Sequence, residues 1–363
     1  MRKTGKMKYP VVKTILNKIY TSRVPDPGDL EFVLSLRDPE EIREVFTFAD
    51  KIREKFCGKG IALRGIIEFS NYCFRRCFYC GINKDNSKIK RYRMSRKEIL
   101  DTVGRLVSCR IKTVVLQSGE DAGIDAAWLE DVILSIKSRF DIAVTLSVGE
   151  RENEDYRLWR RAGAERYLLK IETSNEKLYS SMHPGMDFRH RIGCLNALKS
   201  LGYQTGSGII VGLPGQDLKT IARDILFFKK RDFDMIGIGP FIPHQNTCFT
   251  DKPGGDAGLA LKTLALTRIV TRNAHLPATT ALGSLDRDYR PEGLACGANV
   301  LMPNFTPLPY RKLYEIYPQK RCVSEAPGAC GTCMEKMAKG LGRFIDYSRA
   351  DSLKKRDQFT AHS

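Results

Sequence analysis

Three cysteines stand close together in the stretch CFRRCFYC, which covers residues 73–80. Their spacing is C-x3-C-x2-C, and the three thiols are Cys73, Cys77 and Cys80. Thiolates at this density are typical ligands of soft metals, either zinc or the iron of an iron–sulfur cluster. A structural zinc site wants a fourth ligand at close spacing, and the nearest histidine in the sequence is His183. Zinc would therefore need a distant ligand, whereas a four-iron cluster on three thiolates would keep one iron open.

A second group of thiols lies near the C-terminus, at Cys322, Cys330 and Cys333. Three soft ligands without a fourth partner suit an accessory iron–sulfur cluster, adventitious metal binding or inert thiols. The other five of the eleven cysteines are isolated, and an isolated cysteine is most often a small buried hydrophobe. In a cytoplasmic chain, the two groups indicate metal or redox chemistry rather than a disulfide framework.

The N-terminal sequence and the overall composition predict a cytoplasmic protein. Residues 1–20 are basic but are interrupted by lysine or tyrosine every few positions, so they lack the apolar run of a signal peptide. No apolar stretch is long enough to cross a bilayer, and we expect no membrane partner. The net charge of +18 suits nucleic acid, an acidic partner or an anionic substrate. The densest basic run is 84–97, and the dispersal of much of the remaining excess weakens the nucleic-acid interpretation.

The elements that must position these residues alternate along the chain. Apolar or β-branched runs predict eight strands, at 61–70, 113–119, 142–149, 166–173, 205–213, 235–242, 278–283 and 298–304. Helical patterns lie between them at 95–108, 125–138, 152–162, 190–200, 216–230 and 257–271. No Gly-rich dinucleotide fingerprint follows the first strand. Eight such units predict an α/β fold, a (β/α)8 TIM-type barrel, rather than an open doubly wound sheet.

We expect three parts along the chain. Apolar positions at helical spacing predict an N-terminal helical extension over residues 1–60. The barrel would occupy residues 61–310, and a short C-terminal extension with the second cysteine group would occupy residues 311–363. Within that extension, residues 334–345 predict a helix, and the polar residues 348–363 predict a frayed end.

Catalytic residues of such barrels gather on the loops that follow the strands, and residues 73–80 follow the first strand. The C-x3-C-x2-C motif at this place resembles the signature of the radical S-adenosylmethionine (SAM) superfamily. The resemblance implies a [4Fe-4S] cluster on Cys73, Cys77 and Cys80, with the amino and carboxylate groups of SAM on the open iron. It also implies that an electron from the reduced cluster splits SAM into methionine and a 5′-deoxyadenosyl radical.

Further residues resemble SAM-binding positions of this superfamily. Tyr79 matches the aromatic residue beside the adenine, and SGED (118–121) resembles the glycine–glutamate motif near the SAM amino group. Glu172 and Arg191 resemble the pair that anchors the ribose hydroxyls and the carboxylate, although each would also fit a surface ion pair. The VGLPGQ stretch (211–216) would equally serve as a tight turn. The cofactor-binding residues implied in this way are Tyr79, Gly119, Glu120, Asp121, Ser147, Glu172, Arg191 and Leu213.

Longer stretches resemble the HydE family of [FeFe]-hydrogenase maturases, with methylornithine synthase and biotin synthase as more distant relatives. They include VVLQSGED, FDMIGIGPFIPH, PATTALG and CGANVLMPNFTPLPYRKLYEIYP, within residues 30–345. The resemblance implies a SAM-dependent step in assembly of the H-cluster, acting on an iron–cysteine species that carries carbonyl and cyanide ligands. It implies an organometallic or small-molecule substrate, a reductant such as flavodoxin or ferredoxin, and other hydrogenase maturases as partners.

The same resemblance implies a substrate cavity in the barrel and a role for the C-terminal thiols. The lining residues would be Thr279, Thr280, Met235 and Met302, with Tyr314 and Tyr317 near the floor or exit. Each also has an ordinary structural interpretation, because threonines belong to strands, methionines fill cores and tyrosines three apart form a helical stripe. Cys322, Cys330 and Cys333 match the accessory cluster site of the family.

The chain departs from the family pattern ahead of Glu172, where Lys170 and Ile171 replace an expected Arg-His pair. Lysine keeps the positive charge but loses the planar fork of arginine, so anion recognition beside SAM would be altered. Two alternatives stay open. One is a radical SAM small-molecule enzyme of the methylornithine synthase or biotin synthase type, and the other, more remote, is a basic metal-containing protein that binds nucleic acid.

Overall fold

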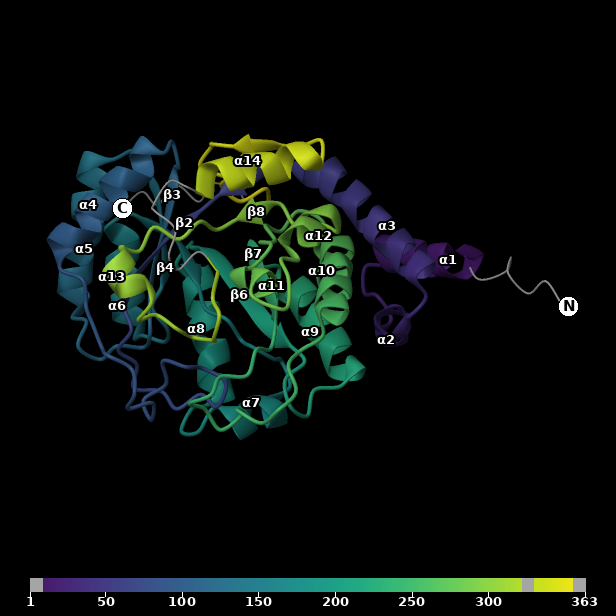
Figure 1. Cartoon of the computed structure of the whole chain (residues 1–363), viewed down its shortest axis with the longest axis horizontal. Coiled ribbons are helices and arrows are strands. Elements are labelled where there is room, and N and C mark those ends of the chain that lie inside the picture. The colour runs from purple at the N-terminus through teal and green to yellow at the C-terminus, as the bar shows by residue number, and fades with distance from the viewer. Residues whose placement is uncertain (1–8, 322–329, 355–363) are drawn as a thin grey trace, which may run out of the picture.

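The structure is a computed structural model that describes residues 9–321 and 330–354. Its centre is a parallel sheet of six strands in the order β2-β3-β4-β5-β6-β7, with helices on its outer side (Figure 1). The strands are β2 (Gly65–Ser70), β3 (Thr113–Ser118), β4 (Ala143–Ser147), β5 (Ala164–Leu168), β6 (Gln204–Val211) and β7 (Met235–Pro240). The helices between and after them are α4 (Arg96–Ser108), α5 (Ala126–Arg139), α6 (Asn153–Arg161), α7 (Glu176–Met182), α8 (Phe188–Ser200), α9 (Leu218–Arg231) and α10 (Ala257–Thr271). Each strand pairs with the next along the chain, as successive βαβ units require.

The two edges of this sheet are connected by short pairings that curl it into a barrel. The pairings are Met235 with His275, Pro277 with Val300, and Ile66 with Asn304. The last strand, β8 (Val300–Leu301), also pairs in parallel with β1 (Gly60–Leu63), which precedes β2. The predicted TIM-type α/β barrel is therefore confirmed, with six strands in one curled sheet and the last two strand positions reduced to short pairings.

One of the eight predicted strands is wrong. Residues 278–283 do not form a strand, because the short helix α11 (Thr280–Gly283) begins directly after Thr279. The hydroxyl of Thr279 donates to the carbonyl of Ile238 on β7 at 3.0 Å, and the chain turns at this contact. A second short helix, α12 (Arg290–Ala295), then leads to β8.

Three helices precede the barrel and lie beside α9 and α10 (Figure 1). They are α1 (Tyr9–Thr21), α2 (Pro27–Ser35) and α3 (Pro39–Cys57). α2 and α3 begin alike, because an aspartate caps each helix and a proline fills its first position. The carboxylate of Asp26 accepts from the Gly28 amide at 2.7 Å, and that of Asp38 accepts from the Glu40 amide at 2.9 Å. α2 packs on α9 and α3 packs on α10.

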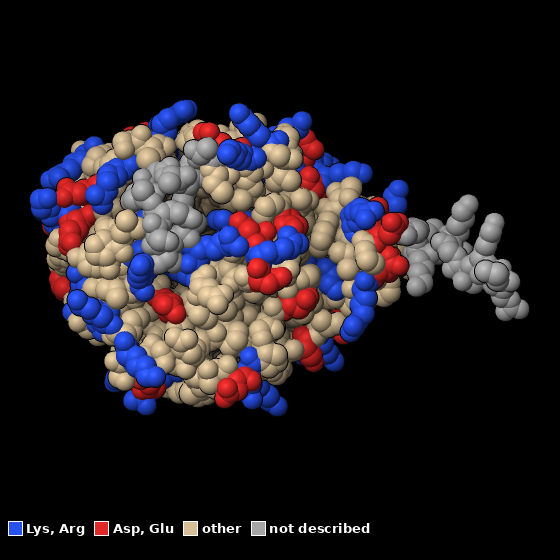
Figure 2. Space-filling view, in the orientation of Figure 1, with Lys and Arg blue, Asp and Glu red and all other residues tan. Residues whose placement is uncertain are grey.

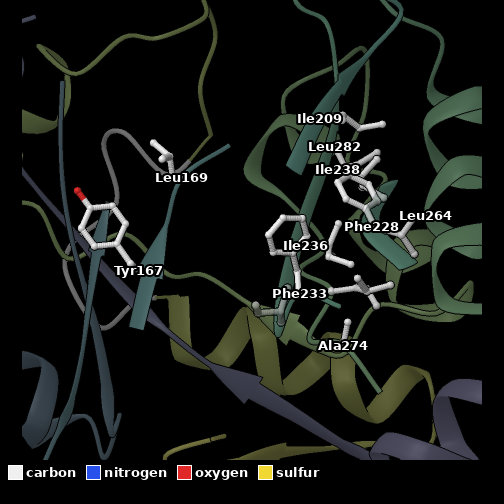
Figure 3. Close-up of a cluster of buried hydrophobic side chains, with 14 of the residues drawn as sticks. Tyr167, Leu169, Ile209, Phe228, Phe233, Ile236, Ile238, Leu264, Ala274 and Leu282 are labelled. Atoms are coloured by element: carbon white, nitrogen blue, oxygen red, sulfur yellow. The ribbon is translucent and has the colours of Figure 1, made fainter. Parts of the chain in front are cut away.

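The hydrophobic core lies between the sheet and its outer helices. Figure 3 shows Phe228 of α9, Leu264 of α10, and Ile236 and Ile238 of β7 in this layer, and all four are buried. Successive residues of a strand point to opposite faces, so Gly237 faces the inside of the barrel. The apolar layer outside the sheet stabilises the barrel.

The C-terminal extension returns to the barrel through a helix and a strand. α13 (Leu308–Arg311) follows β8, and α14 (Cys330–Gly340) leads into β9 (Phe344–Asp346), which pairs in parallel with β1. The helix predicted over 334–345 is therefore too long, because pairing with β1 makes the chain extended from Phe344 onward. Among the described residues, no helix is both long and apolar enough to cross a membrane.

The predicted frayed end is wrong for residues 348–354, which are bound to the barrel. The carbonyls of Arg349, Ala350 and Asp351 each accept a hydrogen bond from a barrel side chain. The hydroxyl of Ser352 donates to Asp234 at 2.5 Å. The remaining residues, 355–363, lie outside the described part of the chain.

Candidate functional site

The loop with Cys73, Cys77 and Cys80 follows the carboxyl end of β2, where catalytic residues of a barrel lie. Its backbone is attached to three different segments. Amide-to-carbonyl bonds run from Phe74 to Glu120 at 3.0 Å, from Phe78 to Met182 at 3.1 Å and from Gly81 to Ile316 at 2.9 Å. These contacts fix the course of the loop around the three thiols.

The chemistry of the three thiols fits an iron–sulfur cluster. Burial raises the pKa of all three, that of Cys80 to about 12, so bare thiolates would be unstable here without a cationic group. Within the described ranges, no three His, Cys, Asp or Glu side chains converge closely enough to hold a single metal ion. A cluster does not require the three thiols to converge on one ion, because each thiolate binds a different iron.

Two glycines allow close approaches at the carboxyl ends of β3 and β4, Gly119 to the cysteine loop and Gly149 to Glu120. A Cβ atom on Gly119 would lie 2.4 Å from the carbonyl oxygen of Tyr72 and 2.7 Å from Cβ of Cys73. Gly149 has a φ of +79°, and a Cβ there would lie 1.9 Å from Cγ of Glu120. A side chain at Gly119 would separate the loop from the end of β3, and one at Gly149 would displace Glu120, so both close approaches require glycine.

Two arginines and two glutamates form a charged cluster beside the loop. Arg75, from the loop itself, pairs with Glu120 after β3 and with Glu150 after β4, the latter at 2.6 Å. Arg191 on α8 donates to Glu150 at 2.6 Å and lies 3.3 Å from Glu120. Burial opposes the charge of Arg191, but Glu150 and Glu120 outweigh it, so the pKa of the guanidinium is raised. The predicted residues Glu120 and Arg191 are thus brought together, whereas Arg75 and Glu150 were missed by the sequence analysis.

Glu172 lies at the same end of the barrel, after β5, in an unusual backbone conformation. Its φ is +61°, which is rare for a residue other than glycine. Two hydrogen bonds to β6 hold it, from the Glu172 amide to Gly208 O at 3.0 Å and from the Ile210 amide to Glu172 O at 3.2 Å. Its carboxylate lies 2.8 Å from the ammonium group of Lys170. Strained backbone of this kind is concentrated at functional sites.

Tyr79 projects from the loop onto a buried histidine. Its hydroxyl lies 2.8 Å from Nε2 of His183, whose Nδ1 lies 2.8 Å from the carbonyl oxygen of Tyr179. Burial lowers the pKa of His183 to about 4, so the ring is neutral at pH 7. The carbonyl of Tyr179 can only accept, so Nδ1 carries the proton and Nε2 accepts from Tyr79. The hydrogen bond to His183 orients the ring of Tyr79, which stands between Cys77 and Cys80 in the sequence.

Comparisons with known proteins identify the family of this site. The family model of the radical SAM superfamily matches residues 67–228. Over 314 residues, the chain is 48% identical to the [FeFe] hydrogenase maturase subunit HydE of Thermotoga maritima, covering 86% of this chain and 90% of that one. The chain belongs to the HydE family of radical SAM enzymes. The family implies a [4Fe-4S] cluster and SAM as cofactors.

More distant relatives share the fold. The 3-methylornithine synthase of Methanosarcina acetivorans is 28% identical over 275 residues, covering 75% of this chain and 77% of the relative. The crystal structure of methylornithine synthase superposes with a TM-score of 0.81 at 24% identity, covering 93% of this chain and 98% of that one. The structure of HydG, described as a maturase of the [FeFe]-hydrogenase, superposes with a TM-score of 0.79 at 19% identity, covering 95% of this chain and 78% of that one. These neighbours show that the same fold extends over nearly the whole chain.

The other residues predicted to bind SAM in this HydE-family chain have different surroundings. Asp121 is held in a bidentate pair with Arg93, at 2.7 and 2.8 Å, and accepts from Ser70 at 2.6 Å, so its carboxylate is already occupied. Ser147 is the last residue of β4. Leu213 is buried in a small apolar cluster against which Tyr79 packs. The SAM-binding role of these three residues stays a prediction.

The residues predicted to line the substrate cavity are divided between two ends of the barrel. Thr279 directly precedes α11 and Thr280 is its first residue, and the side chain of Tyr317 hydrogen-bonds to Thr280 and Ser284. The buried Tyr314 accepts from Gln117 at 3.3 Å, and Met302 directly follows β8. Met235, in contrast, is the first residue of β7 and contacts the guanidinium of Arg64. It therefore lies at the amino end, opposite to the cysteine loop.

The second cysteine group is described only in part. Cys322 lies outside the described residues, Cys330 begins α14 and Cys333 is exposed on the same helix. α14 packs on β9 beside β1, whereas the loop with Cys73 follows the carboxyl end of β2. An accessory cluster at these thiols stays a prediction.

Proposed function

We propose that this enzyme performs the HydE step in the assembly of the H-cluster of [FeFe] hydrogenase. Its substrate would be an iron–cysteine species that carries carbonyl and cyanide ligands. The observation that carries the proposal is the 48% identity to HydE of Thermotoga maritima over nine-tenths of that protein's length. The charged cluster and the strained Glu172 at the strand ends support it, because they provide the polar groups that SAM requires.

Within this proposal, the loop thiols and the charged cluster have separate tasks. Cys73, Cys77 and Cys80 would hold the [4Fe-4S] cluster, and Arg191 would bind the SAM carboxylate. Glu172 would bind the ribose hydroxyls, which donate well to a carboxylate. When bound, the cluster and SAM together supply a 5′-deoxyadenosyl radical.

The protein would shield the reaction and place the second substrate in the barrel. Thr279, Thr280 and Tyr317 present hydroxyl groups at the carboxyl end, and Lys170 adds a positive charge over Gly208 and Gly237 of the inner wall. Exclusion of water protects a reactive primary radical. We propose that these groups orient a substrate with anionic ligands, while a protein reductant and the other hydrogenase maturases act as partners.

Anaerobic reconstitution tests the proposed step directly. The purified enzyme is loaded with iron and sulfide and mixed with SAM, a reductant and the iron–cysteine complex, and the products are followed by EPR. We expect a new iron-centred signal that requires both SAM and the complex, together with consumption of SAM. SAM cleavage that proceeds without any change in the complex would contradict the proposed substrate.

A second candidate function is a carbon-skeleton or sulfur reaction on a small molecule. It is favoured by Lys170, which replaces the arginine expected in the HydE family, and by the similarity to 3-methylornithine synthase. Formation of 3-methylornithine by the reconstituted enzyme would support this alternative. The absence of the other hydrogenase maturases and of a hydrogenase from the source genome would also favour it.

A further inference from the structure

The segment around the loop cysteines is the most basic part of the chain. Residues 72–97 contain nine lysines or arginines and a single acidic residue, Asp85. The second half of this segment folds back along the cysteine loop, because the Lys84 amide donates to Arg75 O at 2.7 Å and Ser70 forms an antiparallel bridge with Arg93. The positive charge is therefore gathered next to the thiols.

Some of these cations serve the local structure, and others do not. The guanidinium of Arg91 donates to four backbone carbonyls of the loop, and Arg93 pairs with Asp121. Lys84, Lys88 and Lys90 are exposed, and their ammonium groups make no hydrogen bond or ion pair with any described residue. These three lysines have no structural task in the described chain, so they are available to an external partner.

The same basic segment carries two exposed aromatic side chains. Tyr72 and Phe74 flank Cys73 and are 36% and 46% exposed, and each ring is covered by an arginine. A recess of about 240 Å³ also opens beside Cys77, lined in part by Arg76. Aromatic residues and arginine are enriched at protein–protein interfaces, and exposed lysines on the same segment add long-range attraction for a negative surface.

We propose that this surface docks an acidic electron-transfer protein that reduces the cluster. The docking surface consists of Tyr72, Phe74, Arg76, Lys84, Lys88 and Lys90. The inference rests on the proposed radical SAM chemistry, which consumes one electron per SAM cleaved. One electron leaves the reduced partner and enters the cluster, so the partner is oxidised by one electron and no proton is transferred. In Figure 1 the loop between β2 and α4 runs along the lower left, and Figure 2 shows lysine and arginine side chains on that margin.

Charge reversal separates docking from catalysis. The variant Lys84→Glu/Lys88→Glu/Lys90→Glu is compared with Lys13→Glu/Lys51→Glu/Lys230→Glu, which changes the net charge equally at exposed positions of α1, α3 and α9. Formation of 5′-deoxyadenosine from SAM is measured with two electron donors. Dithionite, a small reductant, needs no docking surface, whereas reduced flavodoxin, an acidic protein, does.

We expect the rate with dithionite to stay within twofold of wild type in both variants. With flavodoxin at low ionic strength, the rate of the loop variant should fall by about tenfold or more, whereas the control variant should stay near wild type. The difference should shrink at high salt because exposed charges are screened. Equal flavodoxin-driven rates in the two variants would overturn the docking proposal.

Two other outcomes have distinct meanings. If wild-type enzyme fails to cleave SAM with either donor, the proposed function fails, and docking fails with it. A gel-shift titration with a short RNA tests whether the surface binds nucleic acid instead of an electron-transfer protein. Micromolar RNA binding that only the loop variant loses, with an unchanged flavodoxin-driven rate, would assign this surface to nucleic acid and overturn the proposal.

Discussion

Arg191 is oriented by protein groups before any cofactor binds. Its Nε donates to Glu150 at 2.6 Å and its Nη1 to the carbonyl of Lys170 at 2.8 Å. The third contact, from Nη2 to Glu120, is longer at 3.3 Å. The two short hydrogen bonds fix the plane of the guanidinium group. The contact from Nη2 to Glu120 is the weakest of the three, so Nη2 is the group that can bind another carboxylate. If Arg191 anchors SAM as proposed, this order in advance would reduce the conformational freedom that it loses on binding.

Substitution of either proposed SAM anchor should weaken SAM binding. Loss of a hydrogen bond to a charged group costs about 1.5–3 kcal/mol, and about 1.4 kcal/mol corresponds to tenfold in affinity. Arg191→Lys and Glu172→Gln should therefore each raise the dissociation constant of SAM by about ten- to a hundredfold. Anaerobic calorimetric titration of the cluster-loaded enzyme measures this change.

The threonines of α11 provide the matched control. Thr279→Val and Thr280→Val should leave SAM affinity near wild type and impair turnover of the second substrate, because we place them on that substrate. Unchanged SAM affinity in both the Arg191 and Glu172 variants would show that these residues only stabilise the barrel.

Asp224 on α9 fixes the turn that follows Glu172. Its Oδ1 accepts from the amide of Ser174 at 2.5 Å and from the Ser174 hydroxyl at 2.6 Å, and Thr173 lies at 3.3 Å. Burial raises the pKa of Asp224 from 3.8 to about 6. The folded protein thus binds this proton more tightly than the unfolded chain. Its contribution to stability is complete below pH 3.8 and is lost as the pH rises through about 6.

The variant Asp224→Asn should remove this pH dependence, because the amide resembles the protonated carboxyl. Relative to wild type, the stability of the variant should increase by about 1.4 kcal/mol between pH 5 and pH 7.5. Urea unfolding at the two pH values measures the difference, with the exposed Asp286→Asn as control. A difference that is constant with pH would contradict the raised pKa.

At the scale of residues, the sequence predicted those that stand in recognisable motifs. Glu120 and Arg191 were predicted because they match family positions, and the structure brings both into one charged cluster, whereas their role toward SAM stays a prediction. Glu150 and Arg75 were missed because their role depends on pairing across separate strand ends, which spacing along the chain does not reveal. One signal was available, since Glu150 ends TLSVGE just after its strand, as Glu120 follows β3.

At the scale of elements, residues 349–352 form a cover over the amino end of the barrel. Arg349 O accepts from Thr113 of β3 at 2.8 Å and from Arg166 of β5 at 2.6 Å. The side chain of Asp351 accepts from Arg166 at 2.8 Å. Bonds from separate strands to one short segment connect the sheet across its end. The sequence could not predict this, because a polar C-terminal segment is usually frayed.

Removal of the Asp351 carboxylate should destabilise the barrel. Arg166 is fully buried, and a buried guanidinium without its carboxylate is costly, although half of the Asp351 side chain is exposed. We expect Asp351→Ala to lower the free energy of unfolding by about 2 kcal/mol. Asp351→Asn keeps an acceptor and should cost less. Equal stability of Asp351→Ala and wild type in urea unfolding would show that the segment only rests on the surface.

The C-terminal extension supplies a second test at this scale. The triple substitution of Cys322, Cys330 and Cys333 by serine should lower the iron content and leave SAM cleavage largely intact. The reason is that α14 packs on β9, away from the carboxyl end of β2. Iron analysis and 5′-deoxyadenosine formation measure the two effects. Loss of SAM cleavage in a folded triple variant would show that the second group serves the active site.

At the scale of the whole molecule, the alternation of strands and helices was enough to predict the barrel. Its closure was not predictable in detail, because the last two strand positions consist of isolated bridges and the two-residue strand β8, whose partners are distant in the sequence. The bridges of His275 and Pro277 take the position of the seventh strand. The sequence analysis had predicted that strand slightly later, at 278–283. The apolar periodicity predicted the core outside the sheet. The arrangement of the polar groups inside the barrel and the cover over its amino end depend on contacts between residues far apart in the sequence, which periodicity does not show.

The barrel should stay folded when the cluster is removed, because its core is independent of the three thiols. The apolar layer between the sheet and its helices contains none of the loop cysteines, although Cys80 packs against its edge. Removal of iron by an anaerobic chelator should therefore leave the far-UV circular dichroism nearly unchanged. The loop around Cys77 should become more accessible, and trypsin should cut faster at Arg76 and Lys84. SAM should slow this cleavage only in the cluster-loaded enzyme. Collapse of the circular dichroism signal on chelation would show that the cluster is required for the fold itself, in conflict with the continuous core described above.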